Sequence, residues 1–282
     1  GQNVSCWGST NGSALASPSF GTAPYTYQWS ANAASQTTAQ AFNLAAGTYF
    51  VTVTDINGCT AVRSVVVNQP PQITANASVI SDYNGQDVSC FGSHDGSAQV
   101  TFNGGTAPVS YHWDAAAGNQ LNQTAVGLGA GTYFVTVTDI NGCTTQTSVT
   151  LTQPTAVQAS AVVTSDYNGQ NISCFGASDG SAQVNPSQGT SPYTYLWGAN
   201  AGNQTTQEAA NLPAGNYWVT VTDINGCTIS TSVQLTQPMM LAAPASVFSN
   251  YNGYNISCFG ASDGAVISNP VQGTSPYTYL WD

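Results

Sequence analysis

The feature that most constrains this chain is an internal repeat with a period of 84 residues. The cysteine at position 6 returns at positions 90, 174 and 258, each time after a β-branched residue and a serine and before an aromatic residue and a glycine. A second series of cysteines, at positions 59, 143 and 227, has the same period. Because no insertion or deletion interrupts this spacing, we expect each period to be one structural unit in a regular array.

The size and the residue pattern of one period predict a small β-sandwich. Eighty-four residues suit one such domain and are too few for two. Short β-branched and aromatic runs bounded by Gly, Pro, Asn or Asp predict strands, among them Ser97 to Phe102, Thr132 to Thr138 and Tyr193 to Trp197. No segment has a helical pattern, so the sequence predicts an all-β chain of tandem β-sandwich repeats in an extended array.

Turn and proline signals place the boundaries between repeats. Asp139-Ile140-Asn141-Gly142 predicts a hairpin turn between the last two strands, and the same turn recurs from Asp55 and Asp223. Each last strand then meets a Gln-Pro pair, where proline cannot donate to a ladder: Gln69-Pro70, Gln153-Pro154 and Gln237-Pro238. We define repeat 1 as residues 1–70, without its first strand, repeats 2 and 3 as the complete ranges 71–154 and 155–238, and repeat 4 as the truncated range 239–282. The alternating residues after each Gln-Pro, such as Ile73 to Ile80 and Ala156 to Val163, predict a strand that enters the next sandwich.

The charge balance excludes whole classes of partner. Arg63 is the only basic residue, against twelve acidic ones, and the formal net charge is -11. Nucleic acids and anionic lipid surfaces are bound through Lys and Arg, so we expect neither as a partner. No apolar run approaches the about 20 residues of a membrane-spanning helix, and the first residues lack the pattern of a signal peptide. We expect a folded chain without membrane insertion, either mature or a fragment.

Four ordered motifs in the complete repeats resemble the SprB repeat family. They are Cys-Phe-Gly-x-x-Asp-Gly-Ser-Ala (Cys90 to Ala98), Gly-Thr-x-Pro-Tyr-x-Tyr-x-Trp (Gly189 to Trp197), Ala-Gly-Thr-Tyr (Ala130 to Tyr133) and Val-Thr-Asp-x-Asn-Gly-Cys (Val137 to Cys143). That family occurs in very large cell-surface adhesins of gliding Bacteroidota. The resemblance implies an immunoglobulin-like sandwich, export by the type IX secretion route, and a place in an extracellular adhesin or surface filament.

The cysteine grid favours disulfides over zinc, because it contains no Cys-x-x-Cys pair. We predict pairing within each repeat, Cys6 with Cys59, Cys90 with Cys143 and Cys174 with Cys227, which leaves Cys258 without a partner. The reason is distance: after Cys59 about nine residues of strand carry the chain some 30 Å, at about 3.3 Å per residue, before the next repeat begins. Crossed pairs, such as Cys59 with Cys90, and free thiols are the alternatives.

Calcium is the one cofactor that the sequence leaves open. The Asp-x-Asn-Gly segments that begin at Asp82 and Asp166 look like half of a calcium loop, but each offers one Asp and one Asn and lacks the distal Glu. Turn chemistry explains both residue types without a metal. We expect no cofactor; the candidate calcium ligands are Asp95, Asp179 and Asp263, a position that Asn11 takes in repeat 1.

The aromatic residues and the sequons indicate a core and a glycan surface. Each Tyr-x-Trp pair, from Tyr27/Trp29 to Tyr279/Trp281, predicts a core-facing strand, with sugar stacking as the alternative. Tyr49, Tyr133 and Tyr217 resemble the tyrosine corner of immunoglobulin-like domains. Seven Asn-x-Ser/Thr sequons are possible glycosylation sites, Asn3, Asn11, Asn76, Asn122, Asn171, Asn203 and Asn255, and exposed Ser and Thr offer hydroxyl-linked sugar as well.

The sequence contains few residues that are suited to catalysis. The only histidines, His94 and His112, both lie in repeat 2, and other residues replace them elsewhere. With no lysine and no clustered carboxylates, we predict that the chain is not an enzyme. We predict the shaft of an extracellular, cell-surface filament or adhesin, whose repeats contact end to end and whose copies associate laterally. The alternative is a set of carbohydrate-binding or accessory domains of a larger secreted protein.

Overall fold

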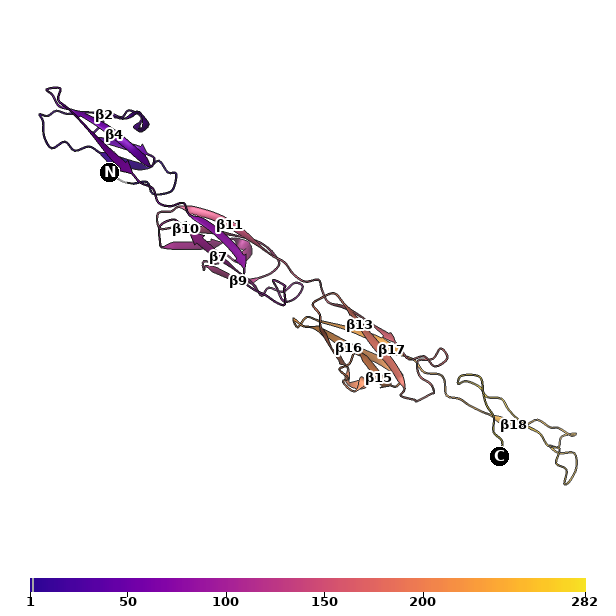
Figure 1. Cartoon of the computed structure of the whole chain (residues 1–282). Coiled ribbons are helices and arrows are strands. Elements are labelled where there is room, and N and C mark those ends of the chain that lie inside the picture. Colours follow the sequence, from indigo (N-terminus) through magenta and orange to yellow (C-terminus); the bar gives the residue numbers. More distant parts are fainter. Residues whose placement is uncertain (2) are drawn as a thin grey trace. The chain divides into compact units, whose positions relative to one another are not determined.

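The computed structural model describes residue 1 and residues 3–282. The described chain is all-β and falls into two compact units, Gly1–Gln153 and Pro154–Asp282 (Figure 1). Three 3-10 turns depart from the expectation that nothing is helical, η1 (Ala31–Ala33), η2 (Ala115–Ala117) and η3 (Ala199–Ala201). Each follows the strand that carries the Tyr-x-Trp pair. None of these turns is long or apolar enough to cross a membrane, and the described residues hold no longer helix.

Repeat 2 folds into two three-stranded antiparallel sheets. One sheet has the order β6-β7-β9 and the other the order β8-β10-β11. The bounds are β6 (Thr74–Val79), β7 (Gly96–Asn103), β8 (Val109–Trp113), β9 (Thr124–Leu128), β10 (Gly131–Asp139) and β11 (Thr144–Leu151). The two strands predicted in this repeat are therefore confirmed as β7 and β10. The Asn-Gly turn joins β10 to β11, with Thr138 opposite Thr144.

Repeat 3 reproduces this arrangement element by element. Its sheets have the orders β12-β13-β15 and β14-β16-β17. The bounds are β12 (Gln158–Val163), β13 (Gly180–Ser187), β14 (Tyr193–Trp197), β15 (Glu208–Leu212), β16 (Gly215–Asp223) and β17 (Thr228–Leu235). The strand predicted at Tyr193 to Trp197 is confirmed as β14. As predicted, the segments after Gln153-Pro154 and Gln69-Pro70 form first strands, β12 and β6.

Repeats 1 and 4 are partial versions of the same sandwich. Repeat 1 has the sheets β1-β3 and β2-β4-β5, with β1 (Gly12–Leu15), β2 (Thr26–Trp29), β3 (Gln40–Leu44), β4 (Gly47–Thr54) and β5 (Thr60–Val67). No described residue supplies a counterpart of β6, and β1 has four residues where its counterpart β7 has eight. Repeat 4 has one short ladder, β18 (Ala245–Val247) with β19 (Val266–Ser268).

The strand order is that of an immunoglobulin-like sandwich. The first, second and fourth strands of repeat 2 form one sheet, and its third, fifth and sixth strands form the other, with β6 also in contact with β11. Residues from the inner faces of both sheets make one core in each of repeats 1, 2 and 3. Trp113 on β8 is fully buried there, and Tyr133 at the start of β10 donates its hydroxyl to the Gly129 carbonyl oxygen at 3.0 Å. Both features are typical of this fold.

Candidate functional site at the repeat junction

The first cysteine of each repeat lies on a loop that is fixed beside the end of the last strand. In repeat 1 this first-cysteine loop covers residues 5–11, and the Gly8 N–H donates to the Gln69 side-chain oxygen at 3.0 Å. The same bond joins Gly92 to Gln153 and Gly176 to Gln237, each at 2.8 Å. Gly8 has φ +74°, a left-handed conformation that favours glycine. The Gln-Pro motif therefore holds the first cysteine at the end where the chain leaves the repeat.

The candidate calcium ligands close this same loop. The Asp95, Asp179 and Asp263 carboxylates accept the N–H of Ser89, Ser173 and Ser257 at 3.0, 3.2 and 3.1 Å. Hydrogen bonds from the two serines lower the pKa of Asp179 and Asp263. In repeat 1 the Asn11 side-chain oxygen accepts the Ser5 N–H at 3.0 Å, so an amide oxygen closes the loop in place of a carboxylate. The position needs a hydrogen-bond acceptor for loop closure, and among the described residues no group of three or more His, Cys, Asp or Glu gathers as a metal site.

The second cysteine of each repeat lies on the hairpin turn at the opposite end of the last strand. In repeat 2 the Asp139 carboxylate accepts the N–H groups of Asn141, Cys143 and Thr106, each at 2.9 Å. Asp55 in repeat 1 and Asp223 in repeat 3 accept the corresponding three bonds. Burial raises the pKa of Asp139, but the bonds from Cys143 and Thr106 outweigh burial, so that this pKa lies below its ordinary value of 3.8. The aspartate thus fixes the direction of the cysteine that follows it.

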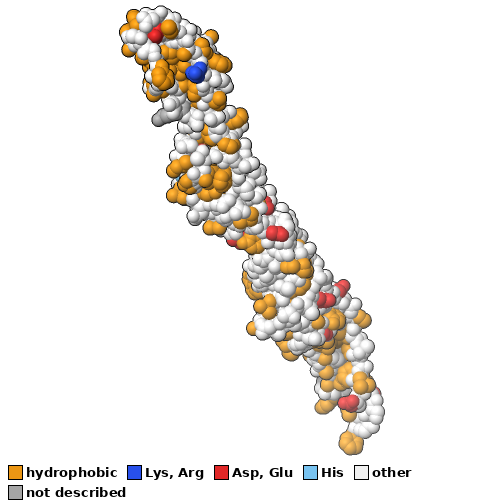
Figure 2. Space-filling view, turned by 60° about the vertical axis from the view of Figure 1, so that its left-hand side comes forward, with side chains coloured by type: hydrophobic (Ala, Val, Ile, Leu, Met, Phe, Trp, Pro, Cys, Tyr) orange, Lys and Arg blue, Asp and Glu red, His pale blue; other side chains and the backbone are white. Residues whose placement is uncertain are grey.

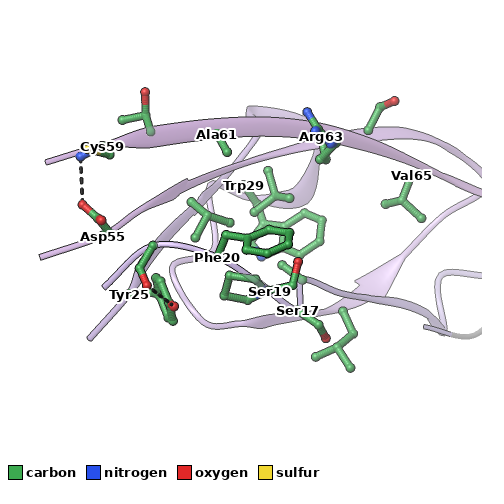
Figure 3. Close-up of a pocket in the computed structure, with 18 residues that line it drawn as sticks. Ser17, Ser19, Phe20, Tyr25, Trp29, Asp55, Cys59, Ala61, Arg63 and Val65 are labelled. Carbon is green, nitrogen blue, oxygen red and sulfur yellow. Dashed lines mark hydrogen bonds between the residues drawn. The ribbon is translucent and has the colours of Figure 1, made fainter. Parts of the chain in front are cut away.

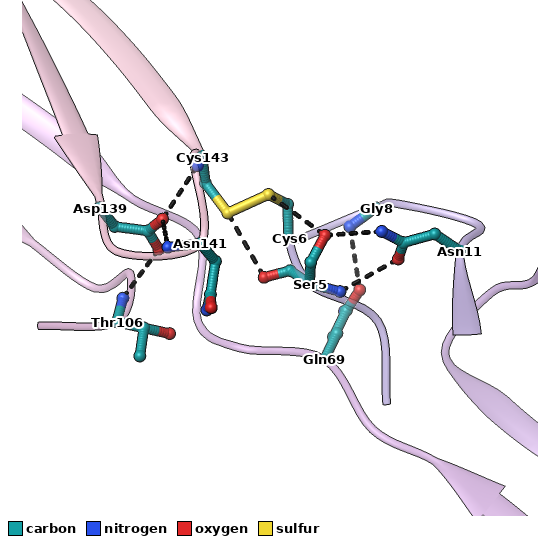
Figure 4. Close-up of a disulfide and its surroundings, with 9 residues drawn as sticks. All are labelled: Ser5, Cys6, Gly8, Asn11, Gln69, Thr106, Asp139, Asn141 and Cys143. Carbon is teal, nitrogen blue, oxygen red and sulfur yellow. Dashed lines mark hydrogen bonds between the residues drawn. A yellow bond between two sulfur atoms is a disulfide. The ribbon is translucent and has the colours of Figure 1, made fainter. Parts of the chain in front are cut away.

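A disulfide between Cys6 and Cys143 joins these two structures across the boundary between repeats 1 and 2 (Figure 4). The two Cα atoms lie 5.6 Å apart, within the usual range for a disulfide. The Ser5 carbonyl oxygen lies 3.4 Å from the Cys143 sulfur, and Cys6 packs against the core of repeat 2. Cys90 and Cys227 are disulfide-bonded as well. Cys59, Cys174 and Cys258 are free and exposed.

The predicted pairing within repeats is therefore wrong. Cys6 bonds to Cys143, which rules out both Cys6 with Cys59 and Cys90 with Cys143, and the free thiol of Cys174 rules out its pairing with Cys227. The physical reason is that the two cysteines of one repeat lie at opposite ends of the last strand. The eight residues of β5 span about 26 Å at about 3.3 Å per residue, several times the separation that a disulfide bridges.

The Tyr-x-Trp strands face the core in the three repeats that have both sheets. Trp29, Trp113 and Trp197 are at most 2% exposed, and each indole N–H donates to a backbone carbonyl oxygen, of Thr38, Asn122 and Thr206. These rings cannot stack on a sugar. The three tyrosine corners are confirmed, because the hydroxyls of Tyr49, Tyr133 and Tyr217 donate to the carbonyl oxygens of Ala45, Gly129 and Pro213.

The sequons divide into two groups by position. Three of the asparagines use their side chains to close loops: Asn11 with Ser5, and Asn3 and Asn171, whose oxygens accept the N–H of Asn68 and Thr236 at 2.9 Å. The other four are exposed, Asn76, Asn122, Asn203 and Asn255. On the face that Figure 2 shows, acidic side chains are scattered among hydrophobic side chains and the white atoms of the backbone and of the other side chains.

An open groove in repeat 1 is a second feature that the sequence analysis did not identify. It has a volume of about 640 Å³, with Trp29 on its floor (Figure 3). Ala61, Arg63 and Val65 of β5 lie along one side, and the segment from Ser17 to Ser19 lies along the other. Cys59 and Asp55 lie at one end of the groove. Side chains along this groove are less buried than their counterparts in repeat 2. Val65 is 36% exposed, whereas its counterpart Val149 is 8% exposed.

The SprB repeat family model matches the chain three times, at residues 2–34, 83–118 and 167–202. Each match contains a first-cysteine loop and the strand with the buried tryptophan. The resemblance found in the sequence motifs is thereby confirmed. A comparison with curated protein sequences finds no match.

Solved structures with tandem β-domains are similar at low sequence identity. They include the N-terminal eight immunoglobulin domains of Down Syndrome Cell Adhesion Molecule, at 11% identity over 75% of this chain and 32% of that chain, with a TM-score of 0.35. A tetra-tandem repeat in the extending region of a large adhesion protein matches at 12% identity over 90% and 82%, with a TM-score of 0.25. Fibronectin(III)-like modules of Clostridium thermocellum CbhA match at 14% identity over 57% and 94%, with a TM-score of 0.24. The chain thus spans about a third of the length of the first of these.

Proposed function

Because the SprB repeat family model matches this chain three times, we propose that it is a segment of the tension-resisting shaft of an extracellular, cell-surface adhesin or filament. In this proposal the repeats are a shaft, in which each sandwich spaces and supports the next, and the chain has no catalytic role. The tryptophans of the Tyr-x-Trp strands, which were the candidates for sugar stacking, are buried in the cores of repeats 1 to 3. This favours the shaft over a set of sugar-binding modules.

The observation that carries the proposal is the position of the Cys6–Cys143 bond. It links the end where the chain leaves repeat 1 to the hairpin at the adjoining end of repeat 2, and it closes a loop of 137 residues. Force applied along the chain passes through this bond before either repeat can be drawn out fully. In the loop-entropy treatment a closed loop of this length also stabilises the folded state by about 5 kcal/mol. A linkage between domains suits a part whose task is to hold its length under tension.

The experiment is to pull the full chain by its two ends with single-molecule force spectroscopy. We expect the oxidised chain to reach a shorter final extension than the Cys143→Ser variant, because the disulfide withholds residues inside its loop. Cys59→Ser is the matched control, since Cys59 is free, and it should leave the extension unchanged. Equal extensions for the oxidised chain and Cys143→Ser would contradict a junction that resists tension.

The location is tested separately, on intact cells. An antibody raised against repeat 2 should label the surface of intact cells that express the protein, and brief protease treatment of the cells should remove the label. Labelling that requires permeabilised cells would contradict a place on the cell surface. The mechanical and cellular results are independent, so each part of the proposal can fail alone.

A further inference from the structure

A second hollow in repeat 1 lies along the edge strand β2. It has a volume of about 490 Å³, which falls within the range of about 300–1,000 Å³ for small-molecule sites. All the residues that line it are uncharged, and all are polar or aromatic: Tyr25, Thr26, Tyr27, Gln28, Thr37, Thr52 and Thr54. We call it the β2 hollow. Because β4 lies between β2 and β5, the hollow does not depend on what covers β5.

The pairing of β2 with β4 arranges the polar side chains of the β2 hollow in two rows. Thr26 lies opposite Thr54, and Gln28 lies opposite Thr52. Thr26 and Gln28 are exposed, whereas Trp29 is buried, so these rows face outwards. The hollow is therefore built on the outer face of the sheet, away from the core of repeat 1.

Several side-chain groups in the β2 hollow are available to a ligand. The Gln28 amide nitrogen donates to the Ser35 carbonyl oxygen at 3.1 Å, which fixes the amide in place. Among the described residues nothing donates to the Gln28 side-chain oxygen, and no hydrogen bond engages the hydroxyls of Tyr27, Thr37 and Thr52. A hydroxyl can donate as well as accept. The hollow thus offers one fixed acceptor and several groups that adapt to either role.

The backbone of β2 adds a donor at the edge of the hollow. The Trp29 N–H donates to the Gln36 carbonyl oxygen at 2.9 Å, whereas the Ser30 N–H donates to the Phe50 carbonyl oxygen of β4 at 2.8 Å. Successive N–H groups of a strand point to opposite sides, so the Tyr27 N–H also points away from β4. Within β2 it is the one edge-facing N–H without a backbone partner. A single donor is too little for a peptide strand to add as a ladder, but it suits one hydroxyl of a small ligand.

The chemistry of the lining selects the class of ligand. An anion would find no cation in the hollow, and a metal ion would find no carboxylate. Tyr25 and Tyr27, both half-buried, present aromatic rings beside the hydroxyl and amide groups. A neutral sugar has the matching groups, because its C–H faces pack against aromatic rings and its hydroxyls both donate and accept hydrogen bonds. The concave form also fits a small molecule better than the flat sheet of a second copy.

We propose that the β2 hollow binds a neutral sugar unit, such as a hexose of a polysaccharide. The sugar ring packs against Tyr25 and Tyr27, and its hydroxyls bond to the Gln28 oxygen, the Thr52 hydroxyl and the Tyr27 N–H. The inference goes beyond the proposed shaft, because a sandwich that resists tension can also hold a sugar on its outer face. The buried tryptophans take no part in this site.

The complete repeats differ in how much of this site they keep. Repeat 3 has the same register, with Thr194 opposite Thr222 and Leu196 opposite Thr220. Leu196 replaces Gln28, and the other six positions are unchanged two periods later: Tyr193, Thr194, Tyr195, Thr205, Thr220 and Thr222. In repeat 2, Val109 and Leu121 replace Tyr25 and Thr37. Repeat 2 therefore supplies an internal control in which the ring and the hydroxyl are absent.

The test is a titration of the full ¹⁵N-labelled chain, followed by the amide resonances of each repeat. The probes are glucose, galactose, mannose and N-acetylglucosamine, with glucuronate as the charged comparison. We expect at least one neutral sugar to shift the amides of residues 25–28 and 52–54 in a saturable way, and glucuronate to bind more weakly. No shift at these amides with any of the four neutral sugars, or glucuronate bound as tightly as they are, would overturn the proposal. Shifts of the same amides when the chain is concentrated without sugar would also overturn it, because a second copy would then fill the hollow.

Matched substitutions test the role of the lining. Thr52→Val keeps a β-branched side chain of similar size and removes the hydroxyl, so the strand is retained. We expect it to lower the affinity at repeat 1 about tenfold, since a tenfold change corresponds to about 1.4 kcal/mol, close to the net value of one hydrogen bond. Thr136→Val makes the same change in repeat 2 and should leave that affinity unaltered. Equal affinity at repeat 1 for Thr52→Val and the unaltered chain would show that the β2 hollow is not the site.

Discussion

Cys6 and Cys143 are separated by 137 positions in the sequence, yet their Cα atoms lie 5.6 Å apart. Hydrogen bonds hold each residue at that place. The Gly8–Gln69 bond fixes the loop of Cys6, and the Asp139 carboxylate fixes the turn of Cys143. Both hydrogen bonds recur in every complete period. The junction is therefore a property of the repeat, with the disulfide placed where two rigid ends meet.

Peptide mapping of the oxidised chain should recover Cys6 and Cys143 in one cross-linked peptide, because the bond joins two different repeats. A protease other than trypsin is needed, since Arg63 is its only site. Reduction should separate the two halves of this peptide. A cross-linked peptide that contains Cys6 and Cys59 would instead restore the pairing within repeats.

The tyrosine corner gives a prediction about stability. Tyr133→Phe removes the hydroxyl that donates to the Gly129 carbonyl oxygen and leaves that buried acceptor without a partner. Loss of such a bond costs about 1 kcal/mol, which lowers the melting temperature of a domain of this size by roughly 4–8 °C. Thermal unfolding by circular dichroism measures the change. Tyr254→Phe, at a site 74% exposed, is the control and should melt at the same temperature as the unaltered chain.

Local patterns in the sequence predicted the fold of repeats 2 and 3 well. The alternation of Tyr193 to Trp197 and the Asn-Gly turn at Asn141 depend on neighbours a few residues away, so a single period contains all the information needed. The same holds for the buried Trp113, which follows from the strand on which it lies. Such features do not depend on how one repeat meets the next.

The pairing of the cysteines could not be obtained in that way, because it depends on which end of the sandwich each cysteine occupies. The length of the strand after Cys59 was available from the sequence, but the place of Cys6 was not. The bond from Gly8 to Gln69 spans 61 residues and is visible only in the structure. Because Cys6 lies beside Gln69, the length of the strand that follows Cys59 excludes Cys59 as its partner. The open groove of repeat 1 could not be predicted from local patterns either, because it depends on how the two sheets lie against each other.

The hairpin aspartates give a prediction about acid stability. Hydrogen bonds from Thr22 and Cys59 hold the pKa of Asp55 below its ordinary value of 3.8, and the pKa of Asp139 is lowered as well. A carboxyl whose pKa falls on folding stabilises the folded state above about pH 4, and this contribution is lost as the pH falls through the folded pKa. We therefore expect the melting temperature to be flat from pH 7 to pH 5 and to fall below pH 4. In Asp139→Asn we expect the melting temperature to fall less steeply below pH 4. The same fall in this variant as in the unaltered chain would contradict a stabilising role for the ionised Asp139.

The exposed sequons give the last prediction. Asn76, Asn122, Asn203 and Asn255 are exposed. Asn3 and Asn11 are exposed too, but they and Asn171 hold loops together through their side chains. If the cell that makes the protein glycosylates asparagine, we expect sugar on the first group and little on the second, because an attached glycan at Asn11 would displace the bond from its side-chain nitrogen to the Ser5 hydroxyl. The intact mass of this stretch, purified from that cell, should then exceed the 29.0 kDa of the polypeptide. Glycopeptide mapping assigns the sites. A mass equal to that of the polypeptide would rule out both asparagine-linked and hydroxyl-linked sugar, and glycan confined to Asn3, Asn11 and Asn171 would contradict the division of the sequons by structural role.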